Sequence, residues 1–230
     1  MVEIRGLQKT SLVDYPPNKA CTVFLGGCNF RCGFCHNPDI VFSKPAAIEE
    51  KEFFEFLEDR KNLLDAVCVT GGEPTLHKYL PQFLMKIKQK GLKVKLDTNG
   101  TNPSMLQNII DNKLADYIAM DIKGPLEDYE KICGTKVDIS KINESIIQVK
   151  RIFDYEFRLT VVPKFITKEN IIKIGELLKG SKRIFLQQFI STADLVDNEL
   201  KGMQPYTIKE LEEMKKILEP YLYKVYIRGV

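Results

Sequence analysis

No stretch of the sequence approaches the ~18 consecutive apolar residues of a membrane-spanning helix, because charged residues recur throughout the chain. The first five residues, Met1 to Arg5, also lack the apolar core of a signal peptide. The net charge is only +3, from 34 basic and 31 acidic side chains, which is too small to indicate binding to nucleic acid or to an anionic membrane. These absences predict a cytoplasmic protein that acts on neither nucleic acid nor a membrane.

The sequence also lacks a linker, since glycine, proline and serine are scattered and no long run of like charge occurs. With 230 residues, 44% of them hydrophobic, the chain is long enough for one large domain with its own core. We therefore expect a single domain over 1–230, with an N-terminal segment at 1–19 and the body of the fold at 20–230. A core of this size needs no disulfide bonds, so the six cysteines require another explanation.

Short apolar runs alternate with longer amphipathic ones. The apolar runs predict buried parallel strands at 20–25, 66–70, 93–96, 117–120, 157–162, 184–189 and 224–227. Helical patterns lie between them at 53–64, 143–153, 171–178 and 207–221. The last of these begins with a capping box, in which Thr207 and Glu210 satisfy each other's backbone N–H groups. This alternation implies right-handed β–α–β units around a parallel sheet.

Polar motifs stand at the carboxyl ends of several predicted strands. They are Gly71-Gly72-Glu73-Pro74, Asp97-Thr98-Asn99-Gly100, Asp121-Ile122-Lys123 and Pro163. Sites at strand carboxyl ends occur both in doubly wound sheets and in barrels. Because these signals spread over successive strands and no Gly-x-Gly-x-x-Gly fingerprint is present, we predict an α/β fold of the partial (β/α)6-type parallel barrel, in a single domain.

Three cysteines, Cys28, Cys32 and Cys35, fall within eight residues directly after the first predicted strand. Thiolates are soft ligands that suit zinc or an iron–sulfur cluster. A structural zinc needs four closed ligands, and His36 is poorly placed as the fourth because it adjoins Cys35. Three thiolates can instead hold three irons of a [4Fe–4S] cluster and leave the fourth iron open. The spacing favours this cluster over zinc.

The other cysteines have less specific surroundings. Cys21 and Cys68 stand within apolar runs and are expected to be small buried side chains, whereas the role of Cys133 stays open. After Cys133 the sequence has no further cysteine, so a single cluster is predicted.

The Cys-x3-Cys-x2-Cys spacing, the aromatic Phe34 and the Gly71-Gly72-Glu73 motif together resemble the radical S-adenosylmethionine (SAM) superfamily. The string 32–38, Cys-Gly-Phe-Cys-His-Asn-Pro, is similar to activating enzymes of glycyl-radical proteins. The opening stretch 6–16, Gly-Leu-Gln-Lys-Thr-Ser-Leu-Val-Asp-Tyr-Pro, is most similar to activating proteins of anaerobic ribonucleoside-triphosphate reductases. The resemblance runs over nearly the whole chain.

This resemblance implies two cofactors, a [4Fe–4S] cluster held by Cys28, Cys32 and Cys35 and SAM bound at its open iron. The reduced cluster would cleave SAM to methionine and a 5′-deoxyadenosyl radical, which would abstract a hydrogen from a glycine Cα of the reductase. Residues implied to bind the cofactor are Phe34, Gly71, Gly72, Glu73, Asp97, Asn99, Asp121, Lys123, Val162 and Gln188. Among these, Glu73 would help hold the methionine ammonium, and Phe34 and Val162 would lie near the adenine.

Other residues carry weaker expectations. Asp14 and Tyr15 correspond to a segment that approaches the substrate in similar activators, although Asp and Pro also form ordinary turns. Arg158 faces into or out of the barrel depending on strand register. His36 and Asn37 are candidates for hydrogen bonding near the cluster, and His77 is expected on the surface. The resemblance also suggests a monovalent cation beside the strand-end aspartates Asp97 and Asp121.

The implied partners are an anaerobic ribonucleoside-triphosphate reductase and, as electron donor, reduced flavodoxin or ferredoxin. Alternatives within the same chemistry are activation of another glycyl-radical enzyme, of the pyruvate formate-lyase type, and a small-molecule reaction such as 7-carboxy-7-deazaguanine synthesis. A non-enzymatic metal-binding module is a further alternative, which a core of this size disfavours.

Overall fold

The computed structural model of the protein describes residues 1–192 and 194–230. Its strands form one eight-stranded sheet whose spatial order follows the chain. The strands β2 to β8 run parallel, whereas β1 pairs antiparallel with β2. Their bounds are β1 (Ile4–Ser11), β2 (Ala20–Leu25), β3 (Ala66–Gly71), β4 (Lys93–Thr98), β5 (Tyr117–Asp121), β6 (Tyr155–Val161), β7 (Arg183–Gln188) and β8 (Lys224–Arg228).

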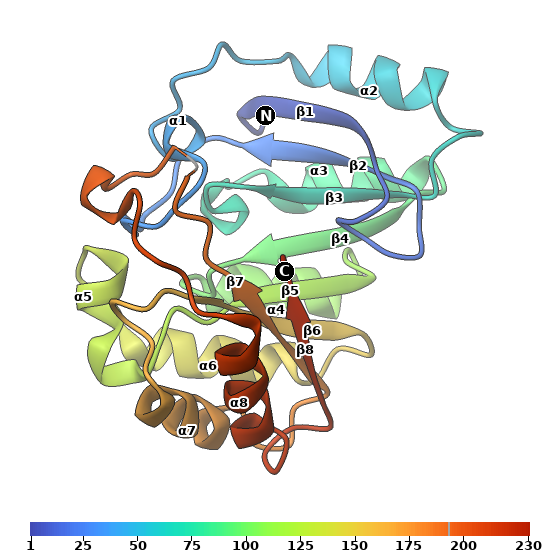
Figure 1. Cartoon of the computed structure of the whole chain (residues 1–230). Helices are drawn as coiled ribbons and strands as arrows, with labels where there is room; N and C mark the ends of the chain where they lie inside the picture. Colours follow the sequence, from blue (N-terminus) through green and yellow to red (C-terminus); the bar gives the residue numbers. More distant parts are fainter. Residues whose placement is uncertain (193) are drawn as a thin grey trace.

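Helices connect the parallel strands and cover the outside of the curved sheet (Figure 1). They are α1 (Pro38–Val41), α2 (Glu50–Asp59), α3 (Leu80–Gln89), α4 (Pro103–Asp111), α5 (Tyr129–Cys133), α6 (Ile139–Val149), α7 (Lys168–Leu177) and α8 (Ile208–Leu218), with 3₁₀ turns η1 (Pro74–Leu76), η2 (Leu126–Asp128) and η3 (Asn198–Leu200). The capping box predicted at Thr207 and Glu210 is present at the start of α8. None of the helices in the described part of the chain is long and apolar enough to cross a membrane.

The predicted partial parallel barrel is confirmed. The seven predicted strands are the parallel strands β2 to β8, one more than a (β/α)6-type barrel contains, and the edges of the sheet are β1 and β8. Part of the segment 1–19 is not outside the sheet, because β1 lies along β2. The sequence does not predict β1, because apolar and polar residues do not alternate along it. In the structure three of its residues are exposed and three are only partly buried.

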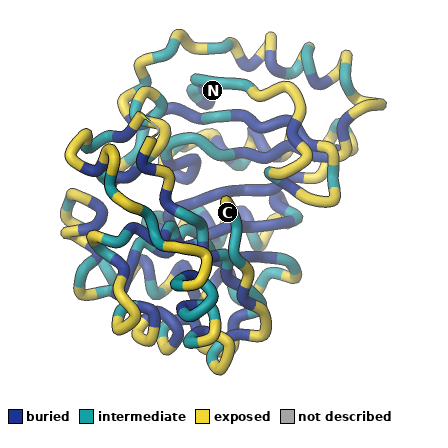
Figure 2. The backbone as a smooth tube through the Cα atoms, viewed as in Figure 1, coloured by how far each residue is buried: buried dark blue, intermediate teal, exposed yellow. Residues whose placement is uncertain are grey.

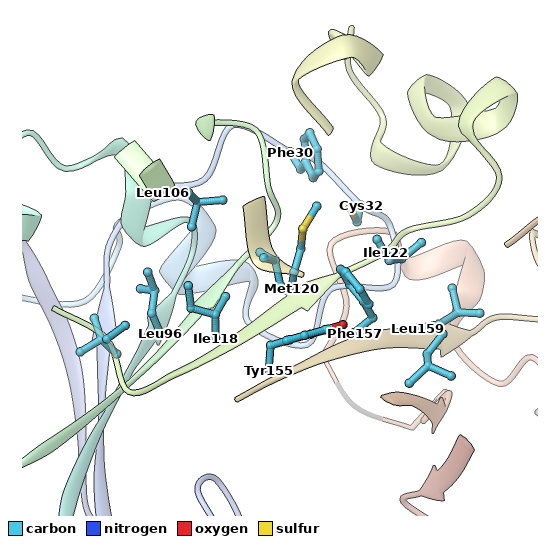
Figure 3. Close-up of a cluster of buried hydrophobic side chains, with 14 of the residues drawn as sticks. Phe30, Cys32, Leu96, Leu106, Ile118, Met120, Ile122, Tyr155, Phe157 and Leu159 are labelled. Carbon is cyan, nitrogen blue, oxygen red and sulfur yellow. The ribbon is translucent and has the colours of Figure 1, made fainter. Parts of the chain in front are cut away.

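The two faces of the sheet differ in chemistry. Alternate strand residues such as Leu96, Ile118 and Phe157 pack with the helices into the main apolar core, and Figure 3 shows Phe30 and Cys32 reaching this core from the cysteine loop. Figure 2 shows the central strands as buried, with exposed residues on the outer turns of the helices. On the inner face, the buried apolar residues Tyr15, Ala20, Ala66, Tyr117 and Ala119 form a small cluster at the amino ends of the strands. Phe185 and Tyr226 stack on the same face further along the sheet, with ring centroids 4.9 Å apart. Polar side chains occupy the carboxyl-end part of this face between them.

Candidate functional site

A cavity of about 290 Å³ opens at the carboxyl ends of the strands, beside the loop that follows β2. In Figure 1 this is the end at which α1, α5 and the orange connection between β7 and α8 gather. The predicted site residues all line it except Glu73, Val162, Asp14 and Tyr15. Residues from β3, β4, β5, β6 and β7 reach the same space, as the positions of the polar motifs predict.

The three clustered cysteines line this cavity together. Cys32 is buried, while Cys28 and Cys35 are partly exposed toward the open space. Their loop is fastened to the fold at Arg31, whose backbone N–H donates to the carbonyl of Cys133 at 2.7 Å. The loop is further held by the Phe30 ring, which packs edge-on against Tyr129 with centroids 6.5 Å apart.

The donor set fits a [4Fe–4S] cluster. Across residues 1–192 and 194–230, no three histidine, cysteine or acidic side chains converge closely enough to hold a single metal ion. A cubane does not need such convergence, because each thiolate binds a different iron. Three thiols around one cavity therefore suit three irons of a cluster, and the cavity leaves room for a ligand at the fourth.

Gly71 and Gly72 are required by the close approach of β3 to the cysteine loop. Gly71 has φ +130°, and a Cβ there would lie 2.2 Å from the Leu25 carbonyl oxygen. A Cβ on Gly72 would lie 1.9 Å from the carbonyl oxygen of Gly27. The Glu73 N–H donates to that same Gly27 oxygen at 2.8 Å. The two glycines thus allow the end of β3 to hydrogen-bond with the residue just before Cys28.

Glu73 lies behind the cavity wall and is completely buried. Its Oε1 accepts hydrogen bonds from Thr75 and from Thr98 Oγ1, and its Oε2 accepts one from the backbone N–H of Asn99 at 2.6 Å. Burial raises the pKa of the Glu73 carboxyl despite these donors. In this arrangement the carboxylate positions Thr98 and Asn99, so the predicted help to the methionine ammonium would be indirect.

Charged side chains of alternating sign line the inner face from β4 to the loop after β5. Lys95 Nζ lies 2.8 Å from Asp97, and Asp97 accepts from Arg158 Nη1 at 2.9 Å. Arg158 Nε also donates to Asp121 at 2.7 Å, and Lys123 Nζ lies 3.1 Å from the other Asp121 oxygen. The chain of contacts holds three cations and two anions, so one positive charge is in excess.

The neighbouring charges decide the ionisation of this network. Burial alone would raise the pKa of the Asp97 carboxyl, but Arg158 and Lys95 hold it below its ordinary value. Asp121 is only half-buried, and Arg158 and Lys123 hold the pKa of its carboxyl far below normal. Burial would lower the pKa of the Lys123 ammonium, but Asp121 raises it above its ordinary value. All three groups are therefore charged at neutral pH.

The sequence did not decide the direction of Arg158, and it did not identify Lys95. The register of β5 and β6 places Arg158 opposite Asp121, on the inner face. Residues two positions apart share a strand face, so Thr160 lines the same cavity. The signal that could have identified Lys95 is its spacing of two residues from Asp97, which places both side chains on one face of β4.

Phe34 and Gln188 line the cavity, and Val162 does not. The Phe34 ring is buried against Phe165, with Lys123 Nζ 6.0 Å from its centroid. Gln188 Nε2 donates to the Tyr206 carbonyl. Val162 is completely buried but outside the cavity wall, so the structure does not bring it to the space where the other predicted residues meet.

Asp14 and Tyr15 both lie toward the amino ends of the strands, away from the cavity at the carboxyl ends. The Asp14 carboxylate accepts a hydrogen bond from Thr22 Oγ1 at 2.6 Å, and Tyr15 packs against Tyr117 with ring centroids 5.5 Å apart. The structure therefore does not bring these two residues to the cysteine cavity. Their contact with a substrate stays a prediction, and it requires a substrate that reaches along the inside of the barrel.

The two histidines have distinct surroundings. His36 lines the cavity and stacks on Phe189, with centroids 6.4 Å apart. His77 is half-buried rather than on the surface, since its Nε2 lies 3.0 Å from the Gly26 carbonyl and its Nδ1 accepts from the Glu3 N–H at 3.4 Å. Burial lowers the pKa of both imidazoles.

The remaining cysteines, Cys21, Cys68 and Cys133, are buried. This confirms the expectation for Cys21 and Cys68. Cys133, whose role the sequence left open, packs beside the cluster cysteine Cys32.

The sequence profile of the radical SAM superfamily matches residues 22–178. The chain is 33% identical to MJ1227 of Methanocaldococcus jannaschii, which is named as a putative glycyl-radical enzyme activating enzyme. The alignment covers 99% of this chain and 96% of that protein. It is 28% identical to the pyruvate formate-lyase-activating enzyme of Clostridium pasteurianum, with 96% of this chain and 97% of that protein aligned.

Solved structures share the fold. Streptococcus suis SuiB bound to S-adenosylmethionine superposes with a TM-score of 0.67 at 16% identity, over 88% of this chain and 48% of that one. A domain of the pyruvate formate-lyase-activating enzyme from Bacteroides vulgatus superposes with a TM-score of 0.58 at 21% identity. The superposition covers 71% of this chain and 99% of that one. The chain belongs to the radical SAM superfamily and is an enzyme of the glycyl-radical-enzyme activating kind, with a [4Fe–4S] cluster and S-adenosylmethionine as cofactors.

Proposed function

We propose that this enzyme activates an anaerobic ribonucleoside-triphosphate reductase by abstracting a hydrogen atom from a glycine Cα of that protein. The observation that carries the activating chemistry is the meeting of three cysteines with the strand-end network of Asp97, Asp121 and Lys123 in one cavity. The opening stretch 6–16, which resembles activators of these reductases, supports the choice of partner.

When bound, the cluster and SAM supply the electron and the adenosyl radical, and the protein supplies position and charge. Cys28, Cys32 and Cys35 would each bind one iron. The network ends in a lysine on each side, and Lys123 is the one that lines the cavity, where an ammonium suits the carboxylate of methionine. Phe34 offers an apolar ring surface within the same cavity, and Asn99 shapes the cavity wall beside Cys28.

The inner face supports a protein substrate rather than a small one. Its polar side chains continue below the cavity as far as Glu156, which accepts from Tyr117 at 2.7 Å. The sheet has two free edges, so the inside of the barrel is not closed by strand pairing between β1 and β8. An extended loop carrying a glycine would find hydrogen-bonding partners there. Reduced flavodoxin or ferredoxin is proposed as the electron donor.

The decisive experiment is anaerobic EPR spectroscopy of the reconstituted enzyme with reductant, SAM and the anaerobic ribonucleotide reductase of the same organism. A glycyl-radical doublet that requires every component is expected. A doublet that persists with the Cys28→Ala/Cys32→Ala/Cys35→Ala variant would refute the cluster assignment. Accumulation of 5′-deoxyadenosine without a doublet would refute the partner while leaving the radical chemistry in place.

A pyruvate formate-lyase is the second candidate partner, favoured by the end-to-end alignment with the Clostridium pasteurianum protein. The same assay with that protein in place of the reductase distinguishes the two. Similarity to 7-carboxy-7-deazaguanine synthases covers only 45% of this chain for Methanopyrus kandleri and 54% for Neisseria meningitidis, which gives that alternative less support.

A further inference from the structure

Three polar side chains join the cysteine loop to the loop after β4 in a closed ring of hydrogen bonds. Asn29, next to Cys28, donates from Nδ2 to Thr101 Oγ1 at 2.9 Å. Thr101 Oγ1 donates to Asn99 Oδ1 at 2.7 Å, and Asn99 Nδ2 donates to Asn29 Oδ1 at 2.9 Å. Each of the three side chains donates one hydrogen bond to the next, so the three hold one another in place.

The backbone determines which way round the Asn99 amide stands. The N–H of Thr101 donates to Asn99 Oδ1 at 3.0 Å, and a backbone N–H can only donate. The amide oxygen must therefore face Thr101, which turns Nδ2 toward the cysteine loop. One Nδ2 hydrogen serves Asn29, and the other faces Cys28 Sγ, 3.9 Å from the nitrogen. The same sulfur also accepts from the Phe30 N–H at 3.4 Å.

The ring is also fixed from behind by the Gly-Gly-Glu motif. Glu73 Oε2 accepts from the backbone N–H of Asn99 at 2.6 Å, and Glu73 is completely buried. Displacement of the Asn99 backbone away from Cys28 would leave this buried carboxylate oxygen without its donor. These hydrogen bonds connect the end of β3 and the end of β4 to the cysteine loop at the Cys28 sulfur.

We propose that this ring sets the reduction potential of the cluster by holding an Asn99 N–H against the Cys28 thiolate. Hydrogen bonds to ligand sulfurs withdraw electron density and favour the reduced state, so they shift the potential of iron–sulfur clusters upward. Asn99 is the donor, and Asn29 and Thr101 are positioning residues that act through it. The inference rests on the cluster assignment of the proposed function and is independent of which protein the enzyme activates.

Thr101→Val tests the ring, because it keeps the shape of the side chain but removes both its donor and its acceptor. The midpoint potential of the reconstituted full-length protein, measured by an EPR-monitored redox titration, is expected to become more negative. Thr101→Ser, which restores the hydroxyl, is expected to return it to the wild-type value. Ser104→Ala is the matched control, since Ser104 Oγ, in the first turn of α4, donates to Asn102 outside the ring and should leave the potential unchanged.

Asn29→Ala provides a second, independent break in the ring, and a shift of the same sign is expected. A wild-type potential in both Thr101→Val and Asn29→Ala, at full cluster content, would overturn the proposal, as would an equal shift in Ser104→Ala. Loss of the cluster from both variants with unchanged circular dichroism would also overturn it, because the ring would then be needed for cluster binding instead. The titration contains neither SAM nor a partner protein, so failure of glycyl-radical formation leaves its result readable.

Discussion

The buried carboxylate of Glu73 accepts a hydrogen bond from the backbone N–H of Asn99 across 26 residues of sequence, at 2.6 Å. This contact connects the end of β3 with the end of β4 directly behind the cysteine cavity. The carboxylate is fully used by Thr75, Thr98 and Asn99, so its role is to shape the cavity wall.

Glu73→Gln is therefore expected to destabilise the fold. The glutamine amide nitrogen would face either the backbone N–H of Asn99 or that of Thr75, which places a donor against a donor in a buried site. One unsatisfied buried donor costs about 1–3 kcal/mol. Urea unfolding of the cluster-free protein measures the change, with Glu55→Gln on the exposed face of α2 as the control. An unfolding free energy equal to wild type in Glu73→Gln would contradict the structural role.

Gly72→Ala tests the contact between β3 and the cysteine loop. Its Cβ would lie 1.9 Å from the Gly27 carbonyl oxygen, and backbone cannot yield as a flexible side chain does. We expect a loss of at least about 3 kcal/mol in unfolding free energy, together with reduced iron content, because the loop must shift. The control is Gly91→Ala, where φ is +79° but nothing lies within 4 Å, so only conformational strain of about 1–2 kcal/mol applies. Equal effects of the two substitutions would refute the packing argument.

Lys123→Met tests the assignment of the excess positive charge to SAM. Asp121 keeps its partner Arg158 in this variant, so the fold should survive. Loss of a charge-assisted hydrogen bond of about 1.5–3 kcal/mol predicts SAM binding weakened roughly 10- to 100-fold in anaerobic calorimetry of the reconstituted enzyme. Lys164→Met removes an equal charge beside Phe165, outside the cavity, and should bind SAM normally. Unchanged affinity in Lys123→Met would exclude this residue from SAM binding.

The sequence predicted the features that depend on local pattern. Apolar runs located all seven parallel strands, and the cysteine spacing with the strand-end motifs located the cavity, because parallel strands bring their carboxyl ends together. Predicting that the three cysteines lie together required no knowledge of strand register, since they occur in one short loop.

What sequence could not provide depends on long-range register and on local turns. Arg158 faces inward because it pairs with Asp121 across β5 and β6, which no single strand reveals. Glu73 turns away from the cavity because Thr75 and Thr98 supply donors behind the wall. The contact of Asn29 with Thr101 joins residues separated by 72 positions.

The network around Arg158 predicts a specific pH dependence. In the wild type the pKa values of Asp97 and Asp121 are depressed in the folded state, so their contribution is complete above the unfolded value of about 3.9 and is lost as pH falls through the folded values. Arg158→Met removes a cation from the buried Asp97 carboxylate and from the half-buried Asp121 carboxylate. Breaking the buried pair with Asp97 predicts a loss of about 3–5 kcal/mol at pH 7.

The difference between the wild type and Arg158→Met should shrink on acidification. Desolvation raises the pKa of Asp97 and Asp121, and Arg158 lowers it. Without Arg158 the folded-state pKa values of both carboxyls therefore rise, and the variant takes up protons at a higher pH than the wild type. Because protonation removes the unpaired charge, the free-energy gap is expected to narrow between pH 7 and pH values near 3, as urea unfolding at several pH values would measure. The control Arg183→Met breaks a partly exposed pair with Asp154 and should cost less than about 1 kcal/mol. A gap for Arg158→Met that stayed constant over this range would show that packing, not charge, accounts for the loss.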